Sequence, residues 1–458
     1  MRDKIDNAPT FAVIGKPNHG KSSIISALMM DDRIQVSSNT GTTKVSSKYS
    51  YKYEDREICN FYDTPGFEQS KTLWGYIRKS QSDTVYGNNI FYEYIENHKK
   101  EISFKKDIEI LEAILESDYV IFVIDISKMY KENSYANELR IMEYLSQNKP
   151  ILILLNKIGS DDHSLLWKEH LHKYTFRTFY EFDPFTTNHK NIINMYQKLY
   201  SIDSSLQGDK QITQILKKHQ NHFDDALQQS AYLIAESLYE MLSLEYRSSR
   251  YNKKEKEEQI FLDKITTLEN KYQQHINKTW GYYELEIVDS RTKIGTKDSL
   301  KLKLSKTEKA LSAALLGAIT VGTTTGVLTG GLGAIGGAAV GILGGGVVGY
   351  FSDGKLIEIK QFNNDALYRV SKSDIDFTII MLTRALEYTH AIMNHSHANR
   401  DKLEICETKK YDFENKDLKT ISTIHNSFVS DKQTHTNKNI LQDMVSILLQ
   451  NFIYEYKR

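Results

Sequence analysis

The sequence predicts a doubly wound α/β domain followed by a mainly α-helical domain that contains a glycine-rich apolar hairpin. Three observations predict this architecture. Apolar runs of strand length alternate with helical patterns up to about residue 200, helical periodicity dominates after residue 205, and no charged residue occurs from 310 to 352. We therefore expect four regions, at 1–204, 205–309, 310–352 and 353–458. A chain of 458 residues is also too long for a single core.

The first domain is predicted from runs that are apolar on both faces. Phe11–Ile14, Tyr119–Asp125 and Ile151–Asn156 are such runs, which suit central parallel strands covered by helices on either side. Helical patterns at Ser22–Met30 and Asn133–Ser146 supply the crossovers. In an open sheet of this kind, ligands lie at the carboxyl ends of the strands.

The second domain is predicted from amphipathic helices. Apolar residues share one helical face from Ile212 to Leu242, and the same spacing recurs from Phe261 to Ile276. The charged run at 247–259 is expected to be a solvated turn or helix surface. His390, His395 and His397 are interpreted as an exposed helix end rather than a metal site, because no short-range carboxylate or cysteine completes a ligand set.

Composition limits the classes of partner and the compartment. Lys plus Arg and Asp plus Glu both number 59, so no global field attracts nucleic acid, and no RNA-binding motif is evident. Nucleic acid is therefore not an expected partner. Cys59 and Cys406 give no disulfide framework, and the N-terminal residues do not resemble a secretory signal. We expect a cytoplasmic protein, or one on the cytoplasmic face of the inner membrane.

The strongest chemical signal is GKPNHGKS at residues 15–22, which fits the phosphate-loop pattern between a predicted strand and a predicted helix. Its glycines let backbone N–H groups approach phosphates, Lys21 neutralises the β and γ phosphates, and the Ser22 hydroxyl would ligate magnesium. The expected nucleotide-binding residues here are Gly15, Lys16, Pro17, Asn18, His19, Gly20, Lys21, Ser22 and Ser23.

A second motif, DTPG at residues 63–66, ends the next apolar strand. Asp63 is placed to hold the metal through water, and the Gly66 amide to contact the γ-phosphate and sense its loss. Between the two motifs, NTGTTK at 39–44 lies where a GTPase needs a switch threonine.

The order GKPNHGKS, TGTTK and DTPG resembles the translation-factor-class GTPases of the Era and TrmE type. The resemblance implies a P-loop NTPase fold, GTP and Mg²⁺ as ligands, and hydrolysis of GTP to GDP and phosphate. It makes Thr43 a metal ligand beside Ser22 and Asp63, with Thr42 as the rival of Thr43. Lys21, Asn18 and Thr43 are then the expected catalytic residues.

Two residues bear on the rate of hydrolysis. Phe67 follows the DTPG motif, where Ras-like GTPases place a water-orienting glutamine, and a phenyl ring cannot orient water by hydrogen bonding. Slow intrinsic hydrolysis is therefore expected. By the resemblance, Asn18 matches the loop asparagine that helps hold K⁺ in potassium-activated members, and the competing interpretation is a turn residue. The first interpretation predicts potassium dependence and a homodimer through the GTPase domains.

The base-recognition motif is incomplete. Members of the family carry Asn-Lys-x-Asp after the fifth strand, whereas this chain has Asn156 and Lys157 followed by Ile158 and Gly159. The aspartate that takes the guanine N–H groups is missing from its place, and Asp161 and Asp162 are the nearby alternatives. The expected preference for guanine over adenine therefore comes from the resemblance to the family and not from this motif.

The apolar stretch from Ala310 to Ser352 repeats glycine every four residues, at 322–330 and again at 333–349. This spacing puts glycines in one row on a helix, which lets two helices approach closely. A hairpin with arms near the ~20 residues needed to span a bilayer fits the length. Membrane insertion or association is the first interpretation, and a buried soluble hairpin and a flexible linker are the others.

Residues 10–395 also resemble a bacterial family in which such a GTPase domain is fused to a helical domain of unknown function. Three functions follow from the sequence. The first is a membrane-associated GTPase whose nucleotide state controls the helical, membrane-interacting domain. The second is a soluble GTPase directed at RNA or the ribosome, and the third is a nucleotide-binding scaffold with little hydrolysis.

Overall fold

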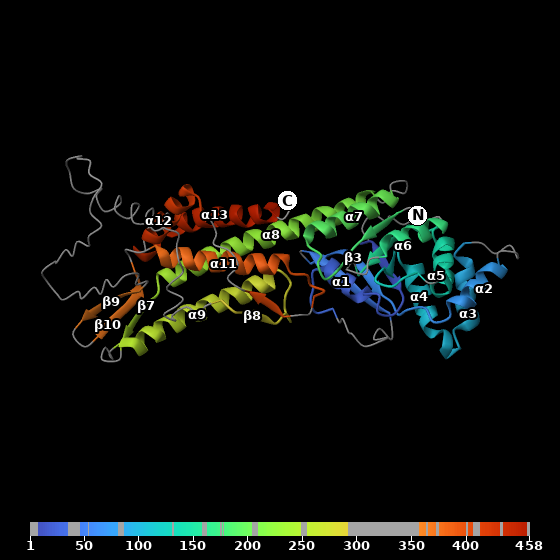
Figure 1. The fold of residues 1–458 in the computed structure, drawn as a ribbon, viewed down its shortest axis with the longest axis horizontal. Helices are drawn as coiled ribbons and strands as arrows, with labels where there is room; N and C mark the ends of the chain where they lie inside the picture. The colour runs from blue at the N-terminus through green and yellow to red at the C-terminus, as the bar shows by residue number, and fades with distance from the viewer. Residues whose placement is uncertain are drawn as a thin grey trace. The chain divides into compact units, whose positions relative to one another are not determined.

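The computed structural model describes residues 8–34, 46–53, 55–80, 87–130, 132–157, 163–174, 176, 178–203, 209–248, 254–291, 357–362, 365–371, 375–399, 402–405, 413–430 and 434–455. They divide into two compact units (Figure 1). The first contains 1–225 with 281–286 and 394–402, and the second contains 226–280, 287–393 and 403–458. The four predicted region boundaries stay a prediction, and the glycine-rich hairpin at 310–352 lies outside the described residues.

The first unit is built on a six-stranded sheet in the order β2-β3-β1-β4-β5-β6. Only β2 runs antiparallel to its neighbour; the other pairs are parallel. The strands are β1 Thr10–Gly15, β2 Ser47–Tyr53, β3 Arg56–Asp63, β4 Tyr119–Asp125, β5 Ile151–Asn156 and β6 Phe179–Glu181. The continuous apolar runs thus form buried central strands, as predicted.

Helices cover this sheet. They are α1 Lys21–Met29, α2 Ser70–Ser80, α3 Asn89–His98, the 3₁₀ turn η1 Ile102–Phe104, α4 Lys105–Glu116, α5 Glu132–Leu145, α6 Ser164–Lys173 and α7 His189–Asp203. Helix α8, Asp209–Leu242, follows and continues into the second unit. The fold class, an α/β P-loop domain followed by a helical region, is confirmed.

Register brings the predicted motifs to one edge of the sheet. Val13 pairs with Asp63, Gly15 with Val123, and Asp125 with Asn156. Strand β1 has β3 on one side and β4 on the other, so the chain order reverses at β1. This is the position at which doubly wound sheets bind ligands.

The second unit is mainly helical. Its helices besides α8 are α9 Lys254–Thr279, α11 Asp376–Asn394, α12 Asn415–Ser430 and α13 Thr434–Glu455. Within this unit α8, α9 and α11 run alongside one another (Figure 1), and residues of all three line a small internal cavity. Among the described residues, no helix combines the length and the apolar character that crossing a bilayer requires.

Short strands also occur in this unit, which the helical periodicity does not predict. Strands β7 Glu245–Ser248, β10 Asp365–Val370 and β9 Ile357–Phe362 form an antiparallel sheet in that order. Strand β8 Ile287–Asp289 pairs with β11 Leu403–Ile405. Part of the run expected to be a solvated turn or helix surface is therefore strand β7.

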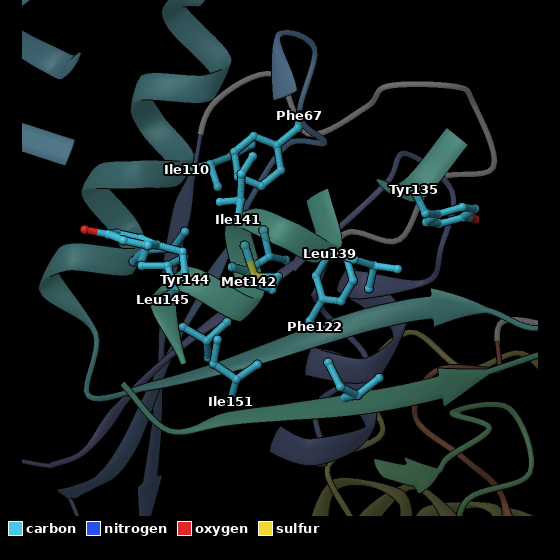
Figure 2. Packing of buried hydrophobic residues seen from close by; sticks show 14 of the residues in the cluster. Phe67, Ile110, Phe122, Tyr135, Leu139, Ile141, Met142, Tyr144, Leu145 and Ile151 are labelled. Carbon is cyan, nitrogen blue, oxygen red and sulfur yellow. The ribbon is translucent and has the colours of Figure 1, made fainter. Parts of the chain in front are cut away.

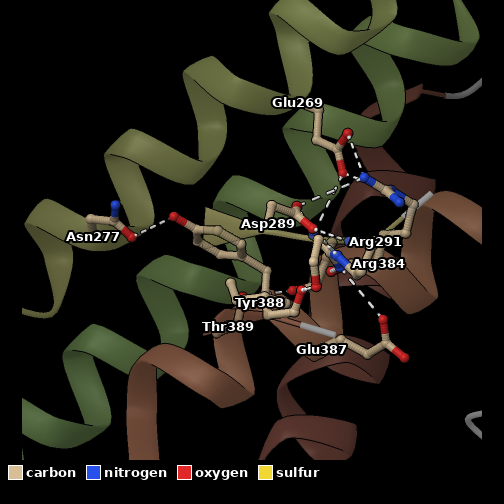
Figure 3. Close-up of polar contacts among 11 residues, drawn as sticks. Glu269, Asn277, Asp289, Arg291, Arg384, Glu387, Tyr388 and Thr389 are labelled. Carbon is tan, nitrogen blue, oxygen red and sulfur yellow. Dashed lines mark hydrogen bonds and ion pairs between the residues drawn. The ribbon is translucent and has the colours of Figure 1, made fainter. Parts of the chain in front are cut away.

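A buried ionic network joins α9, α11 and the end of β8 (Figure 3). The Arg291 side chain is fully buried and donates to Asp289 at 2.6 Å and to the Arg384 carbonyl at 2.6 Å. Arg384 in turn donates to Glu269 at 2.8 Å, and Glu387 lies 3.5 Å from Arg291. Each buried charge therefore has an opposite charge beside it, as burial requires.

Candidate nucleotide-binding site

The loop between β1 and α1 has the backbone conformation that its glycines allow. Gly20 caps α1 with φ +83°, and a Cβ there would lie 2.4 Å from Asn156 Nδ2. Gly15, at φ +151°, would place a Cβ 2.5 Å from the Val123 carbonyl oxygen. The loop is therefore packed against β4 and β5 so closely that only glycine fits at these two positions.

Lys21 begins α1 and is buried. Its Nζ donates to the carbonyl oxygens of Gly15 and Lys16, both at 3.0 Å. Burial lowers the pKa of Lys21 to about 8, while Asp63 and Glu138 act in the opposite direction. The ammonium thus lies inside the loop, at the N-terminus of a helix whose N–H groups favour an anion.

Ser22 and Asp63, two of the three predicted metal ligands, are in contact. The Ser22 hydroxyl donates to Asp63 Oδ2 at 2.5 Å, although the two residues lie on α1 and at the end of β3. A hydroxyl and a carboxylate in contact are oxygen donors of the kind that Mg²⁺ takes. The donor set fits magnesium, while Thr43 and Thr42, the predicted third ligand and its rival, lie outside the described residues.

The DTPG segment is fixed against the phosphate loop. The Thr64 hydroxyl donates to the Val13 carbonyl at 2.7 Å, and a Cβ on Gly66 would lie 2.3 Å from Pro17 Cδ. Gly66 thus lies close to the loop between β1 and α1.

Phe67 points away from this site into the core. It is 8% exposed and belongs to the hydrophobic cluster with Ile110 and Ile141, as Figure 2 shows. Just beyond it, the backbone N–H groups of Glu68 and Gln69 donate to the buried Asp107 carboxylate at 3.4 and 3.0 Å. Burial raises the pKa of Asp107 to about 6. The segment after DTPG is thus held by its apolar side chain and by α4.

Asn156 supports the loop from β5. Its Nδ2 donates to the His19 carbonyl at 2.6 Å, and its Oδ1 accepts from the Lys157 N–H at 2.7 Å. Lys157 Nζ donates to the buried Asp125 carboxylate at 2.7 Å. These contacts orient both residues of the incomplete base motif, whereas Gly159, Asp161 and Asp162 lie outside the described residues.

Sequence reasoning missed Tyr135 and Glu138, which lie beside the loop, and did not predict the burial of His19. His19 is buried, and its ring lies within hydrogen-bond distance of Tyr135 Oη (3.1 Å) and of the Val123 carbonyl (3.2 Å). Burial lowers the pKa of His19 to about 4 and raises that of Glu138 to about 7. Glu138 and Tyr135 both lie on α5, and only the fold brings that helix to the loop.

Segments remote in sequence hold the end of α1. The Asp32 carboxylate accepts from three successive N–H groups, of Tyr283, Glu284 and Leu285, at 2.8–3.0 Å. Gly281 packs against Met30: its φ is +76°, and a Cβ there would lie 2.3 Å from the Met30 carbonyl oxygen. We call this contact the α1 clamp.

Residues from the histidine segment complete the α1 clamp. His397 is 6% exposed and stacks on Tyr282, with ring centroids 4.1 Å apart. The His397 carbonyl accepts from the Ser26 hydroxyl at 2.9 Å. The interpretation of this segment as an exposed helix end is therefore wrong at His397, because its ring is buried against Tyr282.

Two family models match the chain. Residues 10–157 match the model described as "50S ribosome-binding GTPase", and residues 168–446 match the model described as "Domain of unknown function (DUF3482)". The first match confirms a P-loop GTPase domain. The second assigns most of the remaining described elements to a separate domain.

Curated relatives are similar over the first domain. GTPase Der of Chlamydia pneumoniae is 32% identical over 148 residues, which is 32% of this chain and 24% of that protein. GTPase Era of Ureaplasma urealyticum is 30% identical over 35% of this chain and 55% of that protein. The tRNA modification GTPase MnmE of Mycoplasma mobile is 27% identical over 36% of each chain. This chain thus spans between a quarter and about half of the length of these relatives.

Among solved structures, a similar chain is Era in complex with MgGDPNP and nucleotides 1506–1542 of 16S ribosomal RNA. The identity is 18%, the TM-score is 0.27, and the match covers 46% of this chain and 56% of that one. The assignment of the fold therefore rests on the strand order and on the family model.

Proposed function

The chain belongs to the family described as "Domain of unknown function (DUF3482)" and carries an Era-type P-loop GTPase domain. Because of this GTPase domain, we propose that the chain hydrolyses GTP to GDP and phosphate. One observation carries the proposal. The phosphate loop, the Ser22–Asp63 pair and Asn156 converge at the carboxyl edge of one sheet, although they come from three separate motifs.

The residues of the site would have different roles in binding the nucleotide and in its hydrolysis. Backbone N–H groups of the loop and the N-terminus of α1 would bind the phosphates, with Lys21 neutralising charge on the β and γ oxygens. Ser22 and Asp63 would hold Mg²⁺, which supplies positive charge against the charge that develops on the transferred phosphoryl group. Gly66, beside Pro17, would report loss of the γ-phosphate to the segment after it.

Asn18 is the candidate residue for holding K⁺, whose charge would assist hydrolysis. Phe67 is withdrawn into the core, so it does not orient water. Asn18 is exposed on the loop with φ +63°, and its carboxamide would help hold K⁺ beside the phosphates, as the resemblance to potassium-activated members implies. Two GTPase domains facing each other would close such a site, so we propose a homodimer in the GTP-bound state.

Steady-state turnover of GTP in KCl and in NaCl of equal ionic strength tests this proposal. The wild type should hydrolyse GTP at least about tenfold faster in KCl, and Lys21→Ala should abolish turnover. Asn18→Gly keeps the loop conformation, because glycine tolerates positive φ, and should lose only the potassium effect. Equal rates in the two salts would reject the role of Asn18, and no turnover above Lys21→Ala would reject the GTPase.

We also propose that residues 310–352 associate with the inner membrane from the cytoplasmic side. The observation in favour is a 43-residue stretch without a charged residue; Lys306 and Lys309 lie before it, with Glu308, and Lys355 lies after it, with Asp353. Positive charge on both flanks is expected of a hairpin with both ends in the cytoplasm. Nucleotide state would then control a membrane-interacting domain.

Flotation with liposomes of anionic lipid, comparing the wild type with a deletion of 310–352, tests the membrane proposal. Wild-type protein should float and the deletion variant should stay in solution. Because the model that matches residues 10–157 is described as ribosome-binding, a parallel arm measures binding to purified ribosomal RNA. Wild type that stays in solution but binds this RNA would replace the membrane proposal by the RNA-directed one.

A further inference from the structure

The first unit has a pocket that is lined by α2, α5, α6 and the segment after β4. Its volume is about 390 Å³, which lies within the ~300–1,000 Å³ of small-molecule sites. No residue of the phosphate loop, of the DTPG motif or of the Asn156–Lys157 pair lines it. We call it the aromatic pocket, and the GTP site proposed above does not account for it.

Its walls combine aromatic rings with positive charge. The rings are those of Trp74, Tyr130, Tyr174 and His170, and the cations are Arg140 and Lys173. In the part of the chain that the structure describes, neither Arg140 nor Lys173 has a carboxylate within ion-pair distance, and the Trp74 indole N–H has no acceptor. The Arg140 guanidinium lies 5.7 Å from the centre of the Trp74 ring.

These groups fit one class of ligand. Arg140 and Lys173 suit a phosphate, aromatic side chains suit the face of a planar base, and the Glu143 carboxylate suits an amino group on the base edge. We propose that the aromatic pocket binds a nucleoside phosphate whose base carries an exocyclic amino group. The ligand is a free nucleotide or a nucleotide of a single RNA strand, since both present the same groups.

The pocket also has a physical connection to the phosphate loop. His170 stacks on Tyr130 at 3.6 Å, Tyr130 meets Trp167 edge-on at 5.1 Å, and Trp167 meets Tyr135 at 4.8 Å. Tyr135 carries Lys16 Nζ 4.0 Å above its ring and contacts His19. A ligand that shifts Tyr130 should therefore change the position of the phosphate loop, and with it the release of GDP.

Equilibrium dialysis of labelled AMP against the full chain tests the site, with the phosphate loop saturated by Mg²⁺ and a non-hydrolysable GTP analogue. AMP should bind saturably, and UMP, which lacks the amino group, should bind more weakly. Arg140→Ala with Lys173→Ala should weaken AMP binding by about tenfold or more. Lys71→Ala with Arg78→Ala, a pair on α2 that removes the same charge from outside the pocket, should leave it unchanged.

Two results would overturn the proposal: no saturable binding of AMP or GMP at millimolar concentration, or equal affinity in the two double variants. A single-stranded tetranucleotide distinguishes the sources. If it binds more tightly than AMP and responds to Arg140→Ala with Lys173→Ala, the ligand is RNA, and if only the mononucleotide binds, the ligand is free. AMP should also change the rate of GDP release, and an unchanged rate would reject the connection through the rings.

Discussion

The Lys21 ammonium lies among the carbonyl groups of its own loop, and burial lowers its pKa to about 8. Nucleotide phosphates would stabilise the charged form, so we expect Lys21 to have a higher pKa in the complex than in the free protein. Nucleotide binding is therefore expected to take up a proton at any pH at which Lys21 of the free protein is partly neutral. Because the free protein has the lower pKa, nucleotide affinity is highest below that pKa. The affinity falls as the pH rises through it.

We expect the affinity for GDP to be constant up to about pH 7.5 and to fall by about tenfold per pH unit above pH 8. Titration calorimetry over this range measures the affinity, and two buffers of different ionisation enthalpy count the protons taken up. An affinity that stays flat to about pH 9.5 would contradict the lowered pKa of Lys21.

Asn156 acts on the nucleotide through the loop. Its Nδ2 donates to the His19 carbonyl at 2.6 Å, in a fully buried position. Asn156→Ala leaves that carbonyl without this donor, so we expect GDP affinity to fall by about 10- to 100-fold. Asn97→Ala, which removes an exposed contact with Tyr76, is the control and should bind GDP like the wild type. Equal affinity of the two variants would show that Asn156 does not organise the loop.

Among the elements, α1 is held at both ends. The phosphate loop precedes it, and the α1 clamp fixes its C-terminal end through Asp32 and residues 281–286. Hydrogen bonds to a charged acceptor stabilise a fold by about 1.5–3 kcal/mol. Asp32 thus fixes the end of α1 that lies opposite the phosphate loop.

Asp32→Asn should destabilise the first unit by about 2 kcal/mol, because the amide offers one acceptor oxygen to the N–H groups that share the carboxylate. Thermal unfolding should shift by about 4–8 °C. Asp31→Asn is the matched control: Asp31 pairs with the half-exposed Arg33, so its loss should cost about 1 kcal/mol or less. If both variants unfold at the same temperature, the α1 clamp contributes nothing to stability.

Some of the elements could be predicted from the sequence, and others could not. The phosphate loop, Asp63 and the central strands are predictable because each is encoded by a local run with its own chemistry. Strand β7 is not, since Glu245–Ser248 is a short run without clear alternation and pairs with Asp365–Val370 far along the chain. The same holds for Asp32 and Tyr283, and for His19 and Tyr135, whose contacts only the tertiary fold creates.

At the level of the whole molecule, the chain joins a nucleotide site to a second, mainly helical unit. Residues 281–286 lie in the α1 clamp and are continuous with α9 before them and β8 after them. The second unit carries the uncharged stretch 310–352 in its sequence, which lies outside the described residues.

Liposome flotation in the presence of a non-hydrolysable GTP analogue, of GDP or of no nucleotide tests the proposal that nucleotide state controls membrane association. We expect the floated fraction to differ by at least about tenfold between the GTP analogue and GDP, which corresponds to about 1.4 kcal/mol of coupling. The difference should vanish in Lys21→Ala, because this variant lacks the ammonium expected to neutralise the phosphates. The same floated fraction in all three states would contradict the claim.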